Sequence, residues 1–140
     1  MKKIVAVFLF LVAAHVNAGT IWNKTHDIDR WTEKALIDAE GTTPKVIDAY
    51  SAAYKKWDVA LNAAYRSLMK RLPERDKELL RDSQRKWVAY RDAEFKFQPI
   101  HLQRRGGTLS RIITSERRNN FIRDRVIELE GYIFVFDSAP

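Results

Sequence analysis

The chain contains no cysteine among its 140 residues. This absence excludes disulfide bonds, thiol nucleophiles and thiolate metal ligands. Small exported proteins often depend on disulfides, so a chain of this kind must be held together by packing and polar contacts instead. Four tryptophans, five tyrosines and seven phenylalanines supply large apolar surfaces for that packing.

Groups suited to catalysis or metal binding are also scarce. After residues 1–18, the histidines are His26 and His101, which lie in separate segments and form no metal-ligand spacing such as His-x-x-x-His. The serines do not occur in a nucleophile-elbow pattern. We therefore predict that the protein is not an enzyme and has no catalytic residue, no metal site and no cofactor.

One long apolar run is present, at residues 4–14, directly after Lys2 and Lys3. Residues 16–18 (Val-Asn-Ala) then place small side chains at positions suited to cleavage. This order is typical of a secretory signal peptide. A short membrane anchor is the alternative, although the run is too short to span a bilayer comfortably.

Cleavage after Ala18 would leave residues 19–140 as one exported domain with a single core. We expect this domain in the periplasm or outside the cell, with no membrane-spanning segment. That location disfavours nucleic acid as a partner. The remaining alternatives are a protein or an anionic component of the envelope.

Positive charge is concentrated in residues 104–125, although the whole chain has a formal net charge of +7. That segment carries seven arginines against Glu116 and Asp124. Arginine forms bidentate contacts with carboxylates and phosphates. The segment therefore predicts an anion-binding surface, while the alternative is a solvated helix face with one buried arginine.

Apolar residues recur every three or four positions along most of the chain, which predicts helices. We expect helices at residues 27–39, 44–71, 73–97 and 108–130, with an irregular segment at 98–107. The last helix either ends at Gly131 or continues through the apolar residues 132–136. The fold class is therefore all-α, a small antiparallel bundle of about four helices with a long hairpin formed by the second and third.

Punctuating residues set the expected helix ends. Asp27 or Asp29 can cap the first helix, and Gly41 stops it. Thr43 followed by Pro44 predicts the start of the second helix. Pro99, Gly106 and Gly107 interrupt the chain after the third helix.

Polar residues at helical spacing mark the second and third expected helices. In an antiparallel hairpin the acceptor groups of one helix would lie beside the donor groups of the next. A contact between Asp58 and Arg91, bridged by Asn62 and Gln84, is one plausible arrangement. The predicted structural polar network comprises Asp58, Asn62, Tyr65, Gln84, Trp87, Arg91 and Arg125.

This network has two interpretations. A carboxylate, an amide and an arginine could form a ligand pocket, or they could determine the register of the two helices. Because the segment supplies no nucleophile or base, we favour the structural role.

The same residues resemble a known family. The pattern Asp58-x-x-Leu61-Asn62-x-x-Tyr65, followed by Gln84-Arg85-x-Trp87-x-x-Tyr90-Arg91-Asp92, is similar to the LprI-type lysozyme inhibitor N-terminal domain family. Gly106-Gly107-Thr108 and Arg125-x-x-x-Leu129 extend the resemblance. It implies a small exported helical protein, and members usually carry disulfides that this chain lacks.

The resemblance implies non-catalytic protein binding, with lysozyme as the candidate partner. The charge pattern suggests the alternative, a module that binds an anionic envelope glycan, lipid head group or acidic protein. Both hypotheses use the glycine-containing segment and the arginines around it. The predicted binding residues are Arg104, Arg105, Gly106, Gly107, Thr108, Arg111, Arg117 and Arg118.

Overall fold

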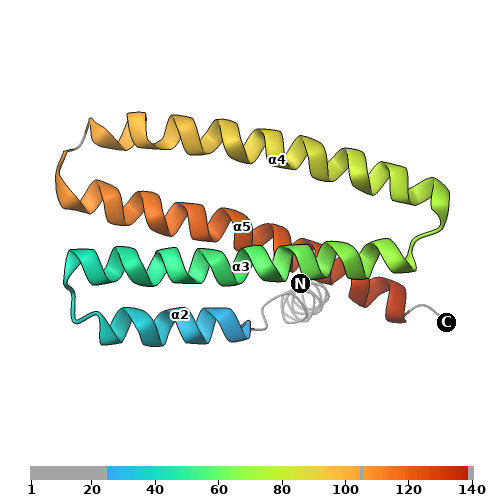
Figure 1. Ribbon diagram of the computed structural model, residues 1–140, viewed down its shortest axis with the longest axis horizontal. Helices are drawn as coiled ribbons and strands as arrows, with labels where there is room; N and C mark the ends of the chain where they lie inside the picture. Colours follow the sequence, from blue (N-terminus) through green and yellow to red (C-terminus); the bar gives the residue numbers. More distant parts are fainter. Residues whose placement is uncertain (1–24, 105, 139–140) are drawn as a thin grey trace, which may run out of the picture.

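The computed structural model describes residues 25–104 and 106–138 (Figure 1). The predicted signal peptide at residues 1–18 and the predicted binding residue Arg105 lie outside them. The described residues form four helices and no strand, which confirms the all-α prediction. None of these helices is long and apolar enough to cross a membrane.

The four helices are α2 (Asp27–Asp38), α3 (Thr43–Arg71), α4 (Glu74–Gln103) and α5 (Gly107–Ser138). Consecutive helices run in opposite directions, so α3 and α5 run in the same direction (Figure 1). Two contacts show the same parallel direction. Asn119 Nδ2 of α5 lies 2.7 Å from the Tyr50 carbonyl oxygen in the first part of α3, and Asp137 Oδ1 lies 2.8 Å from Arg71 Nε at the C-terminal ends of both helices.

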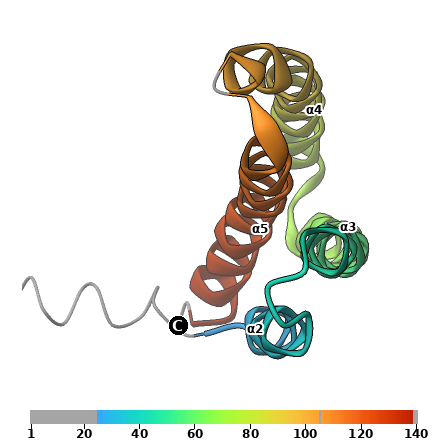
Figure 2. The same cartoon turned by 90° about the vertical axis from the view of Figure 1, so that its left-hand side faces the viewer.

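Helix α5 is the centre of the packing. It lies along α3, while α2 packs on α3 and α4 packs on α5. Figure 2 shows α5 between α4 on one side and the pair α2 and α3 on the other. The predicted α3–α4 hairpin therefore exists as a chain reversal at Leu72 and Pro73, but the main partner of α3 is α5.

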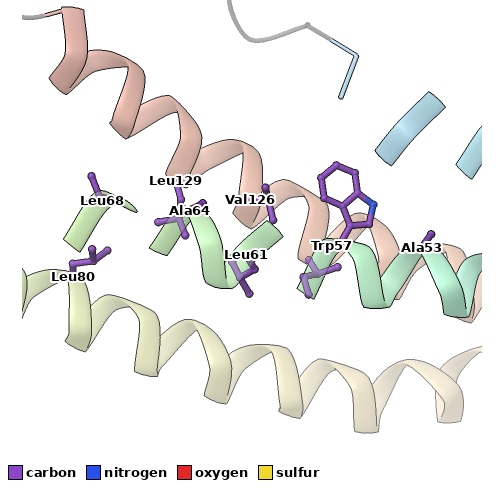
Figure 3. Packing of buried hydrophobic residues seen from close by; sticks show 9 residues of the cluster. Ala53, Trp57, Leu61, Ala64, Leu68, Leu80, Val126 and Leu129 are labelled. Atoms are coloured by element: carbon purple, nitrogen blue, oxygen red, sulfur yellow. The ribbon is translucent and has the colours of Figure 1, made fainter. Parts of the chain in front are cut away.

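The core lies where α3 faces α5 (Figure 3). Trp57 is 2 % exposed and is the largest of its fully buried side chains, and burial of a side chain of this size contributes on the order of 3 kcal/mol. Leu80 of α4 joins near the chain reversal. The buried cluster comprises Ala53, Trp57, Leu61, Ala64, Leu68, Leu80, Ile122, Val126 and Leu129.

The start of α2 differs from the prediction in its cap. The N-cap residue is His26, whose Nδ1 accepts a hydrogen bond from the Ile28 amide at 3.0 Å. In turn, the Asp29 carboxylate accepts a hydrogen bond from the His26 amide at 3.2 Å. The His26 ring also packs on Trp57, with ring centroids 4.7 Å apart, and this tertiary contact favours histidine over Asp27 as the cap.

The start of α3 is shifted by one residue from the expected cap at Thr43. Thr42 is the N-cap, without a side-chain hydrogen bond, and Pro44 occupies the first turn as predicted. Gly41 has a φ of +70° in the turn between α2 and α3. Such a conformation favours glycine, which explains the break at this position.

The irregular segment expected at residues 98–107 is wrong for most of its length, because α4 continues through Pro99 to Gln103. A proline inside a helix removes the hydrogen bond to the carbonyl four residues earlier, here that of Phe95. Arg118 of α5 replaces the lost donor: its Nη2 lies 3.1 Å from the Phe95 carbonyl oxygen. The tertiary contact thus compensates the missing bond and allows the helix to continue.

The C-terminal apolar segment continues α5 as far as Ser138, so Gly131 does not end the helix. Gly131 is buried, whereas Tyr132, Phe134, Val135 and Phe136 are exposed by 44–58 %. The helix end is held by Arg71, whose guanidinium contacts both carboxylate oxygens of Asp137 at 2.8 and 2.9 Å.

A second bidentate ion pair joins α2 to α5. Arg123 Nε and Nη2 donate to the two carboxylate oxygens of Asp29 at 2.7 and 2.9 Å. Partial burial opposes ionisation of Asp29, but the hydrogen bond and charge of Arg123, together with the hydrogen bond from the His26 amide, outweigh it and lower the pKa of the carboxyl. The pair therefore stabilises the folded state when Asp29 is ionised.

We expect Asp29→Asn to lower the free energy of unfolding by about 1 kcal/mol at pH 7, since the pair is partly exposed to solvent. Because the folded-state pKa is lowered, the contribution is complete above the ordinary carboxyl pKa and is lost as the pH falls below about 5. Urea unfolding of both proteins from pH 7 to pH 3 measures this, and a constant difference across that range would contradict it.

Candidate functional site

Five of the seven residues predicted to form a polar network line an open groove between α3 and α4; Trp87 and Arg125 do not. We call this the α3–α4 groove. Its volume is about 480 Å³. Its lining comprises Asp58, Leu61, Asn62, Tyr65, Arg81, Gln84, Arg85, Val88 and Arg91.

The groove does not contain the expected bridge between Asp58 and Arg91. Asn62 Nδ2 donates to the Asp58 carbonyl oxygen at 2.8 Å, within α3. Arg91 donates to Asp92 on its own helix at 2.8 Å and packs on Trp87, 5.5 Å from the ring centroid. Within the described residues, no hydrogen bond or ion pair joins Asp58 to Arg91. Since α3 packs mainly on α5, the two helices stay too far apart for that contact.

The buried polar contact lies instead between α4 and α5 and is centred on Arg125, which is 6 % exposed. Its guanidinium donates to Gln84 Oε1 at 3.1 Å, Ser83 Oγ at 3.2 Å and Glu128 Oε2 at 2.7 Å. It also lies 5.9 Å from the Trp87 ring centroid. Of the predicted network, the structure therefore brings together Gln84, Trp87 and Arg125.

Aromatic side chains reinforce the same interface. Phe121 of α5 contacts Trp87, Tyr90 and Phe95 of α4, with ring centroids 5.3–5.8 Å apart. Such tilted pairs contribute roughly 0.5–1.5 kcal/mol each beyond their buried area. The network that we expected between α3 and α4 is thus an α4–α5 contact, with Asp58, Asn62 and Tyr65 on the other side of the groove.

The chemistry of the groove suits polar binding. Its lining has one carboxylate, Asp58, and three guanidinium groups, those of Arg81, Arg85 and Arg91. Arg85 is the most open, with 72 % of its side chain exposed. In the part of the chain that the structure describes, no three His, Asp or Glu side chains are placed to hold a metal ion.

The second candidate surface lies where α4 turns into α5, at one end of the bundle (Figure 1). We call it the arginine tip, and it comprises Arg104, Gly106, Gly107, Thr108 and Arg111. All five are exposed. The two glycines have φ values of +69° and +79°, which allow the reversal between the helices.

The arginines of the tip are available to a partner. Arg104 and Arg111, and the exposed Arg117 further along α5, form no ion pair within the described part of the chain. Ile100 and Leu109 beside them are 61 % and 65 % exposed. Exposed apolar and guanidinium groups together are typical of protein-binding surfaces.

Arg118 differs from the other predicted binding residues. It is half-buried, donates to the Phe95 carbonyl oxygen and lies 5.2 Å from the Phe95 ring centroid. It therefore lies inside the bundle and does not belong to the arginine tip. The spacing from Phe95 to Pro99 was the available signal, because a proline frees the carbonyl four residues before it.

The family model described as lysozyme inhibitor LprI matches residues 37–129. The matched segment begins in α2, includes all of α3 and α4, and ends in α5. No curated protein and no solved structure is significantly similar to the chain.

The two arginines of the predicted network should differ in their effect on stability. We expect Arg125→Met to lower the free energy of unfolding by about 2 kcal/mol, since it removes three part-buried hydrogen bonds of a buried guanidinium and leaves Gln84 without its donor. Arg91→Met should change it by about 0.5 kcal/mol or less, because Arg91 bonds an exposed neighbour.

Urea unfolding of both variants, with Arg85→Met as an exposed control, measures these differences. An equal loss in Arg91→Met and Arg125→Met would mean that the groove residues also hold the bundle together.

Proposed function

This chain belongs to the LprI lysozyme inhibitor family, and from that premise we propose that it is an exported, non-catalytic protein that binds and inhibits a lysozyme. The observation that carries the proposal is the family match over α3, α4 and most of α5. Neither the α3–α4 groove nor the arginine tip combines a nucleophile with a base, so binding is the activity that these surfaces support best.

We assign the contact to the arginine tip. Glycosidases of the lysozyme type use two carboxylates that flank the bond they cleave, within a cleft. A guanidinium group forms bidentate hydrogen bonds with a carboxylate. Arg104 and Arg111 are exposed at the end of the bundle and form no ion pair with any residue that the structure describes. Insertion of the narrow α4–α5 turn would place them beside those carboxylates.

The exposed arginines also support a second candidate function. Arg104, Arg111 and Arg117 could bind an anionic glycan or lipid head group of the cell envelope. Binding of that kind weakens steeply as salt is added, because exposed charges are screened. Dependence on salt therefore distinguishes the two candidates.

The inhibition proposal predicts that the purified protein slows lysis of cell-wall substrate by at least one enzyme in a panel of lysozymes. The double variant Arg104→Glu/Arg111→Glu should lose at least about tenfold in inhibition, which corresponds to about 1.4 kcal/mol. Arg75→Glu is the matched control, since Arg75 is 90 % exposed at the opposite, α3–α4 end.

Inhibition that survives the double variant but is lost in Arg75→Glu would exclude the arginine tip as the contact. No inhibition by a stoichiometric excess of protein, together with salt-sensitive binding to anionic vesicles or glycans, would favour the second candidate instead.

A further inference from the structure

A separate cavity lies among α3, α4 and α5, in the half of the bundle that carries the α4–α5 turn. Its volume is about 290 Å³, which is near the lower end for small-molecule sites. Tyr50, Ser51 and Tyr54 contribute from α3, Phe95 from α4, and Ser115, Arg118 and Asn119 from α5. It shares no lining residue with the α3–α4 groove or the arginine tip.

Asn119 lines this cavity and has an unused acceptor just beneath its surface. The residue is 6 % exposed. Its Nδ2 donates to the carbonyl oxygens of Tyr50 and Ser115, at 2.7 and 3.0 Å. Two carbonyl acceptors determine which end of the amide is nitrogen. Oδ1 is therefore held in place, and it is buried without a hydrogen-bond partner among the described residues.

Arg118 presents an unused donor and a positive charge. Its Nη2 is engaged by the Phe95 carbonyl oxygen that Pro99 leaves free. Its Nε is buried and has no hydrogen-bond partner among the described residues, nor does the guanidinium form an ion pair there. A buried donor without a partner costs about 1–3 kcal/mol, and more when it is charged. A ligand that supplies an anion would recover that cost.

The walls of the cavity combine aromatic rings with hydroxyl groups. The rings of Tyr54 and Phe95 lie with centroids 6.2 Å apart at 58°. The described residues that line the cavity include no carboxylate. Burial raises the pKa of Tyr50, and Glu116 adds to this rise. Burial also raises the pKa of Tyr54. Both hydroxyls are therefore neutral at physiological pH and can donate a hydrogen bond.

We propose that this cavity binds a small hydroxylated carboxylate, a sugar acid of monosaccharide size. Its carboxylate would pair with the Arg118 guanidinium. A small shift of the Arg118 and Asn119 side chains would bring the buried Arg118 Nε to that carboxylate and the buried Asn119 Oδ1 to one of its hydroxyl groups. The apolar face of its ring would pack on the aromatic wall. A neutral sugar would leave the guanidinium without a counterion, and acetate would leave Asn119 without a donor.

Nuclear magnetic resonance of ¹⁵N-labelled protein tests the site, because the Arg118 Nε–H and the Asn119 side-chain amide give their own signals. Titration with D-glucuronate should shift both signals in a saturable way. D-glucose and acetate should bind at least about tenfold more weakly, a difference of about 1.4 kcal/mol. Equal shifts with all three compounds, or tighter binding of inorganic phosphate, would overturn the assignment.

A variant that supplies the missing anion gives a second test. Ser115→Asp would place a carboxylate in the cavity near Arg118 and should reduce glucuronate affinity at least about tenfold. Asn120→Asp adds the same charge on the same helix at an exposed position outside the cavity and should leave affinity unchanged. An equal loss in both variants would contradict the site.

The titrations of the unaltered protein remain decisive if Ser115→Asp does not fold. If glucuronate moves neither signal while both protons exchange magnetisation with long-lived water, water occupies the cavity and the proposal is wrong. The lysozyme assay measures the arginine tip, so either proposal can fail without the other.

Discussion

Helix α5 contacts each of the other three helices, and the arrangement of the whole bundle depends on these contacts. Its apolar face packs on α3 through Ile122, Val126 and Leu129. Its arginines reach the other two helices: Arg123 pairs with a carboxylate of α2, and Arg125 forms hydrogen bonds with α4. In a chain without cysteine, these side chains connect elements that are distant in the sequence, as disulfides do in many small exported proteins.

This arrangement divides the arginine-rich segment by role. Arg118, Arg123 and Arg125 face the other helices and are half-buried or buried, whereas Arg111 and Arg117 are exposed. Guanidinium groups suit both tasks, because their planar donors serve buried carbonyls and carboxylates as readily as an external anion. The arginine-rich segment therefore combines residues that hold the helices together with residues that are open to solvent, and the two proposed binding sites use different members of the segment.

Central placement of α5 also explains the α3–α4 groove. With α5 as the main partner of α3, the α3 and α4 faces that carry Asp58 and Arg91 remain apart. Sequence spacing placed these residues correctly on their helix faces. It could not say which helix each face would meet, because that depends on how all four helices share one core. Leu80 and Gln84 of α4 meet the other helices on the inner side.

By itself, the sequence determined the four helices, most of their ends and the family of the chain, since apolar periodicity and residues such as Pro44, Pro73 and Gly41 act locally. Only the tertiary structure decided the contacts that come from residues distant in the sequence. His26 caps α2 while packing on Trp57, and α4 passes through Pro99 because Arg118 reaches the freed carbonyl. The physical reason is range: helix propensity acts within one turn, whereas a missing hydrogen bond can be replaced by any donor that the fold brings near.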